Sequence, residues 1–114
     1  MSLIQDHDDE IINIFSSIDK VEKVYLQPPS NGKLVYPCII ISPASTTTTY
    51  ADDIPYMAFR TFDVLVIDYD MESSIPGDIL KLDNNFYIQP GRYYTADNLC
   101  HWSYTFIFRK SILV

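Results

Sequence analysis

The residues best suited to chemistry in this sequence are two histidines, two cysteines and a scatter of carboxylates. A nucleophile requires a base within hydrogen-bond distance, and that base requires a third group to orient it. Cys100 and His101 are neighbours in a predicted strand, where adjacent side chains point to opposite faces, so they do not form a nucleophile and base pair. Asp63 and Asp68 also fall on opposite faces of a predicted strand, which excludes a paired acid and base.

The other candidate groups have structural explanations. Asp97, Asn98 and His101 surround a predicted turn, and an Asp-Asn pair is typical of turns whose side chains bond their own backbone. Residues 6–10 (Asp-His-Asp-Asp-Glu) are consecutive on a predicted helix, so their side chains diverge and do not converge on one metal ion. The sequence has no Gly-rich phosphate loop, no Cys-x-x-Cys pair and no His-rich spacing. We therefore expect no catalytic, cofactor or metal site, and we expect that the protein is not an enzyme.

Length and charge narrow the class of protein further. The 114 residues suit a single domain, residues 1–114, with one buried core. A net charge of −7 with only eight Lys and Arg argues against a nucleic-acid partner, because phosphate binding requires clustered cations. No apolar run approaches the roughly 18 residues of a membrane span, and the acidic N-terminus does not suit a signal peptide. We expect a cytosolic chain with no membrane partner, in which Cys38 and Cys100 are buried free thiols.

A helix is predicted at the start of the chain. Ile4, Ile11, Phe15 and Ile18 recur at spacings of seven, four and three, which places them in one apolar stripe of a helix over residues 3–18. The carboxylates of its first turns suit the positive end of the helix dipole. Because this stripe is the longest apolar cover available, replacement of Phe15 by Ala is expected to be severely destabilising.

Strands are predicted at residues 24–27, 36–41, 57–69 and 86–88, with a last strand starting beyond Asn98. The second and third have apolar groups on both faces, which favours central positions in a sheet. Pro90-Gly91 is expected to break the fourth strand, because proline supplies no donor to a ladder.

The last predicted strand shows a strict alternation. Trp102, Tyr104, Phe106 and Phe108 share one face, which we expect to pack beneath the first helix. A short helix, capped by Ser73 or Ser74, precedes the strand at residues 86–88.

The predicted fold class is α+β. It comprises a mainly antiparallel sheet of four to five strands with two helices packed on one face, since no connection is typical of a repeated βαβ crossover. The polar segment from Pro43 to Pro55 is long for a connection in a small domain. We expect it to form a long projecting loop, or a hairpin in which the threonines extend the flanking strands.

Several fragments follow one another in a recognisable order: 36–39 (Tyr-Pro-Cys-Ile), 50–56 (Tyr-Ala-Asp-Asp-Ile-Pro-Tyr), 64–68 (Val-Leu-Val-Ile-Asp), 74–76 (Ser-Ile-Pro) and 94–99 (Tyr-Thr-Ala-Asp-Asn-Leu) with His101. Together they resemble the small tail terminator proteins of tailed bacteriophages, also called tail completion or minor tail proteins. The resemblance covers residues 36–108, and its most specific part is the string at 94–99. Two departures concern loops: Tyr69 to Ser73 replaces a usual Asp-Pro-Asp-Ser, and Pro90-Gly91 replaces a usual Phe-Asp.

The resemblance implies a structural protein of the virion tail or neck, assembled in the host cytoplasm. Such a protein forms a homo-oligomeric ring, expected to be a hexamer, at the head-proximal end of the tail tube. There it terminates tube polymerisation and provides the surface for head-tail joining. Its partners are the tail tube protein and a head-tail connector or neck protein. Two alternatives stay open: a connector or neck protein of similar size, and a monomeric phage regulatory binding protein.

The expected assembly interface lies in the polar segment after the second predicted strand. Its threonines support extended backbone that adds to a neighbour's edge, and its large apolar side chains supply anchors. A mobile surface loop without a partner is the alternative. The candidate residues are Thr46, Thr47, Thr48, Thr49, Tyr50, Asp52, Asp53, Ile54 and Tyr56.

Part of the surplus acidity is expected to face a channel that DNA crosses, because a wall of carboxylates repels phosphate. The alternative is that these residues serve ordinary solubility. The candidate channel residues are Asp6, Asp8, Asp9, Asp52 and Asp53.

Overall fold

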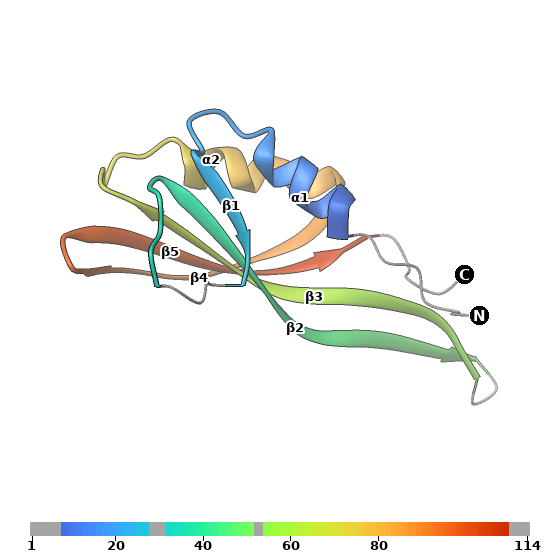
Figure 1. The fold of residues 1–114 in the computed structure, drawn as a ribbon. Helices are drawn as coiled ribbons and strands as arrows, with labels where there is room; N and C mark the ends of the chain where they lie inside the picture. The colour runs from blue at the N-terminus through green and yellow to red at the C-terminus, as the bar shows by residue number, and fades with distance from the viewer. Residues whose placement is uncertain (1–7, 28–31, 52–53, 110–114) are drawn as a thin grey trace.

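The fold was analysed in a computed structural model that describes residues 8–27, 32–51 and 54–109, with residues 8, 43–51 and 54–58 described by their backbone alone. Two helices, a short 3-10 helix and five strands follow one another within these residues (Figure 1). Their bounds are α1 Asp8–Ser16, β1 Lys23–Leu26, β2 Cys38–Ala51, β3 Ile54–Asp68, α2 Ile75–Leu80, η1 Lys81–Asn84, β4 Phe86–Ala96 and β5 Leu99–Phe108.

The strands form one sheet in the order β1-β2-β3-β5-β4. β1 pairs with β2 in parallel, and every other pairing is antiparallel. Both helices lie on the same face of this sheet, as Figure 1 shows. The predicted α+β class, with a mainly antiparallel sheet covered by two helices, is confirmed.

The main core lies between the helices and the sheet. Phe15 of α1 is fully buried, with its ring centroid 5.4 Å from that of Phe86 and 5.3 Å from that of Phe106. Tyr104, Phe106 and Phe108 are buried on the same face, and the half-buried Trp102 packs against the cluster. The predicted aromatic face of the last strand therefore does lie on the helix side of the sheet.

A smaller core covers part of the opposite face. Cys38, Ile40 and Ile67 are buried there beneath Leu34 and Tyr36, which precede β2. Since neighbouring residues of β2 are buried on the helix side, the predicted burial of this strand on both faces is confirmed. Leu99 of β5 also packs against this smaller core.

The predicted break of the fourth strand at Pro90-Gly91 is wrong. β4 continues from Phe86 to Ala96, with a register shift between Pro90 and Tyr93. The Ser103 hydroxyl accepts a hydrogen bond from Arg92 N (2.9 Å) and donates one to Arg92 O (3.2 Å). A side chain of β5 thus supplies hydrogen-bond partners where the backbone ladder is interrupted. The strand therefore continues past its proline through a bulge.

The helix ends also differ from expectation. The predicted start of the first helix lies outside the described residues, and α1 ends at Ser16 rather than residue 18. α2 follows Ser74, but the Ser74 side chain makes no capping bond. The Ser73 hydroxyl accepts a hydrogen bond from Ile75 N instead (3.3 Å).

Candidate functional site: an assembly surface

β2 and β3 extend far beyond the part of the sheet that the helices cover (Figure 1). β3 pairs with β5 only as far as Thr61 opposite Ile107, whereas its pairing with β2 continues to Ile54 opposite Ala51. The far part, residues 45–51 and 54–60, is therefore a two-stranded ribbon. Its projection makes the molecule 51 Å long, with a radius of gyration of 15.3 Å where about 13 Å is typical of a compact chain of this size.

The predicted hairpin accounts for most of the expected interface residues. Thr46 to Thr49 pair with Arg60 to Met57, and Tyr50 pairs with Pro55. Ile54 and Tyr56 belong to β3, so the ribbon brings seven of the nine candidates together. The other two, Asp52 and Asp53, lie between the two strands in sequence and outside the described residues.

The predicted channel acids are only partly described. Asp6, Asp52 and Asp53 lie outside the described residues, while Asp8 begins α1 and the Asp9 side chain is exposed on it. That these carboxylates face a channel stays a prediction.

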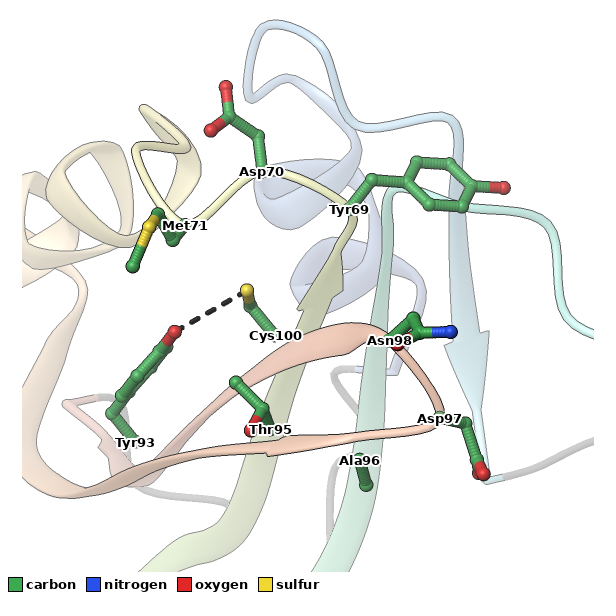
Figure 2. A pocket seen from close by; sticks show the side chains of 9 residues that line it. All are labelled: Tyr69, Asp70, Met71, Tyr93, Thr95, Ala96, Asp97, Asn98 and Cys100. Carbon is green, nitrogen blue, oxygen red and sulfur yellow. Dashed lines mark hydrogen bonds between the residues drawn. The ribbon is translucent and has the colours of Figure 1, made fainter.

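A hollow of about 740 Å³ lies at the other end of the molecule, beside the β4–β5 turn (Figure 2). The sheet contributes one wall, and the loop after β3 contributes the opposite one. Three large side chains in it are 46% to 70% exposed: Tyr69, Met71 and Tyr93. The remaining lining residues are Asp70, Thr95, Ala96, Asp97, Asn98 and Cys100.

The groups inside the hollow are not arranged for catalysis. The Tyr93 hydroxyl donates to the Cys100 sulfur at 3.4 Å (Figure 2), and this hydrogen bond raises the pKa of Tyr93. His101 lies on the other face of β5, with its ring stacked on Tyr94, as the alternation predicted. Asp70 accepts a hydrogen bond from Glu72 N (2.9 Å), so one carboxylate oxygen is engaged within its own loop.

Both cysteines are buried free thiols, which confirms that prediction. Burial raises the pKa of Cys38 to about 11, so this thiol stays protonated at neutral pH. Within the residues described, no three His, Cys, Asp or Glu side chains are grouped so that they could hold a metal ion. None of the described helices is long and apolar enough to cross a bilayer.

The β4–β5 turn matches its prediction. Asp97 and Asn98 have φ angles of 54° and 62°, the left-handed conformation that both central residues of a type I′ hairpin turn require. Asp and Asn tolerate this conformation better than most residues do. The string at residues 94–99, which is the most specific part of the resemblance, therefore forms this turn and borders the hollow.

No protein-family model, curated protein or solved structure matches this chain significantly. The two surfaces are therefore interpreted from their geometry. Sequence reasoning identified the ribbon from its threonines and its length. It missed the hollow, because the approach of the loop at residues 69–71 to β4 depends on tertiary packing and leaves no periodic signal.

Proposed function

We propose that this chain is a tail terminator of a tailed bacteriophage: a structural virion protein that forms a ring on the head-proximal end of the tail tube. The ring ends tube polymerisation and presents the surface to which the head connector binds. Six copies, the number implied by the resemblance, is the expected stoichiometry.

The observation that carries the proposal is the ribbon formed by the far halves of β2 and β3. A two-stranded hairpin is marginally stable in water, and its two edges leave backbone groups unpaired. Over residues 54–60, β3 has only β2 as a described partner. A neighbouring copy or the tail tube provides partners for these unpaired backbone groups, which gives the ribbon a role in assembly.

The positions of the two surfaces favour a ring. The ribbon projects at one end of the sheet, and the exposed hollow lies at the other (Figures 1 and 2). A contact between unlike ends is heterologous, so it repeats from copy to copy and closes into a ring when the rotation allows. The resemblance over residues 36–108 then favours a terminator among ring-forming proteins.

The experiment is electron microscopy of phage particles made without this protein. A terminator predicts overlong tail tubes and heads without tails, because nothing stops tube growth. Tubes of normal length would overturn the proposal. If such tubes were accompanied by unjoined heads, the chain would instead be a connector or neck protein.

A further inference from the structure

The ribbon has a second free edge, which runs along β2. β1 covers the outer edge of β2 only as far as Ile41, which pairs with Leu26. The next residue, Gln27, has a φ angle of 72°, which lies outside the extended region, so β1 ends there. β2 continues to Ala51 (Figure 1), and no strand of the described chain pairs with its outer edge over residues 45–51. We call residues 45–51 the β2 edge.

The β2 edge lacks the features that protect the other edges of this sheet. β1 is only four residues long and begins with Lys23, while β4 contains Pro90 and a bulge. The ribbon edge of β3 contains Pro55 and Arg60. Short strands, prolines, bulges and charges all discourage the addition of a further strand. An edge without them is a ready template for another strand.

The residue types of the β2 edge favour such an addition. They read Ser-Thr-Thr-Thr-Thr-Tyr-Ala, with no proline and no charged residue. Each residue therefore keeps its backbone donor, and the β-branched threonines favour extended backbone. Residues of this kind over seven positions indicate that another strand covers the edge.

Electrostatics indicate that a second copy of the chain can approach along this edge. Copies with a net charge of −7 repel one another, so they meet most easily where neither presents a carboxylate. The sequence from Ser42 to Ala51 contains no charged residue. Two copies that meet along this stretch bring no like charges directly opposite one another within it.

The β2 edge is also complementary to itself. When two identical strands pair antiparallel about a two-fold axis, one residue lies opposite its own counterpart. With Thr47 at the centre, Thr46 lies opposite Thr48, and Ser45 lies opposite Thr49. Every pair from residue 45 to residue 49 then consists of two hydroxyl residues, and cross-strand Thr–Thr and Thr–Ser pairs stabilise a sheet.

Pairing through this edge would also stabilise the ribbon itself. A two-stranded hairpin is marginally stable in water, whereas three or more strands support one another. Two ribbons joined along β2 make a four-stranded sheet in the order β3-β2-β2-β3. Residues 54–60 of β3 remain at the outside of this sheet, where they are available for a different contact.

We propose that two copies of this chain pair in solution through their β2 edges, antiparallel and centred on Thr47. The contact is isologous, so it joins copies two by two and does not by itself build a ring. The proposed ring depends on the outer edge of β3 instead. The inference therefore goes beyond the proposed function and does not rest on it.

Disulfide formation tests the pairing and its centre. In the dimer, the two copies of residue 47 lie directly opposite, with Cα atoms about 4.5–5.5 Å apart, which a disulfide can bridge. The two copies of residue 49 are offset by about four residues, or about 13 Å, which is too far. Residues 47 and 49 share one face of the strand, so position 49 is a matched control.

The variants Thr47→Cys and Thr49→Cys are oxidised separately without denaturant, and covalent dimers are followed by non-reducing electrophoresis. The parent is oxidised alongside to control for its own buried thiols, Cys38 and Cys100. We expect Thr47→Cys to form covalent dimers at least about tenfold faster than Thr49→Cys. Equal rates at the two positions would show that the pairing is not centred on Thr47 and would overturn the inference.

Sedimentation velocity over a concentration series tests the contact without new thiols. Thr47→Lys places two like charges opposite one another, and we expect it to raise the dissociation constant of the dimer at least about tenfold. Ser16→Lys makes the same change of charge at an exposed position of α1 and should pair like the parent. Urea unfolding checks that each variant folds.

The outcomes separate this inference from the proposed function. A parent that is monomeric at all concentrations, or a Thr47→Lys variant that pairs like the parent, overturns the β2 contact and leaves the ring proposal standing. A parent whose β2 edge is covered only on tail tubes gives the first of these results. A dimer with the expected properties, in a phage whose tubes keep normal length without this protein, supports the inference and overturns the terminator.

Discussion

At the scale of single residues, the bulge in β4 depends on the close approach of Gly91 to Ser103. A Cβ placed on Gly91 would lie 2.5 Å from the Ser103 Oγ and 2.8 Å from the Ser103 backbone oxygen. The backbone oxygen cannot rotate away, so a larger residue must push β4 and β5 apart. The Ser103 hydroxyl also forms two hydrogen bonds with the Arg92 backbone, so this contact links the stability of the strand to the position of Arg92.

We predict that Gly91→Ala destabilises the protein by about 1–3 kcal/mol, as is usual when a methyl group is forced into a filled space. Urea unfolding measures the change. Gly77 in α2 is the matched control, because a Cβ there meets no atom within 4 Å. Gly77→Ala should leave stability unchanged or raise it by up to about 1 kcal/mol, since Ala favours a helix. Equal effects of the two replacements would contradict the close approach.

The Cys38 thiol gives a prediction on pH. Burial raises its pKa to about 11 in the folded chain, above the value of an exposed thiol, near 8.5. Between these pH values the unfolded chain loses a proton that the folded chain keeps, so stability falls as pH rises. The slope approaches about 1.4 kcal/mol per pH unit.

Unfolding free energies at pH 8, 9 and 10 for the parent and Cys38→Ala test this slope. Subtracting the two removes the contributions of Tyr93 and Tyr104, whose pKa values are also raised. Burial and the neighbouring Cys38 both raise the pKa of Tyr36, so the part due to Cys38 is counted with the thiol. The parent should lose stability more steeply than the variant. Parallel curves would show that the thiol ionises alike in both states.

At the scale of elements, α1 packs on the core through Ile11 and Phe15, and Phe15 is the larger of the two. Phe15 is fully buried against Phe86 and Phe106. We predict that Phe15→Ala costs about 3–5 kcal/mol, because it removes buried area and leaves a cavity. The neighbouring Ser16 is exposed, so Ser16→Ala should change the unfolding free energy by less than about 0.5 kcal/mol. A Phe15→Ala variant as stable as the parent would mean that α1 does not hold the core.

Element by element, the sequence predicted what periodicity and turn chemistry encode. The alternation of residues 102–108, the turn at Asp97-Asn98 and the central position of β2 are all local or compositional signals, and all three are confirmed. The passage of β4 through Pro90-Gly91 was missed, because it depends on Ser103, which is distant in sequence. The position of Arg92 over the Tyr94 ring was missed for the same reason, since the bulge decides on which face the Arg92 side chain lies.

The ribbon can be shortened without changing which face each side chain occupies. Deleting Thr46–Thr49 together with their partners Met57–Arg60 removes four residues from each strand, an even number that preserves the alternation. We predict that this variant folds with an unfolding midpoint close to that of the parent and does not form rings. Circular dichroism reports folding, and sedimentation velocity reports assembly. A shortened chain that still forms rings would show that the ribbon is not an assembly element.

At the scale of the whole molecule, the two ends of this elongated chain present different surfaces. The ribbon extends from one end, while the hollow and the stacked rings of Tyr94 and His101 lie near the β4–β5 turn at the other (Figure 1).

Negative-stain electron microscopy of purified tail tubes from the cognate phage, mixed with this chain, tests the proposed terminator most directly. We predict a closed ring, expected to contain six copies, at a single end of each tube, and tubes that no longer lengthen when tube protein is added. Bare tubes that continue to grow, with the chain remaining a monomer in solution, would contradict it.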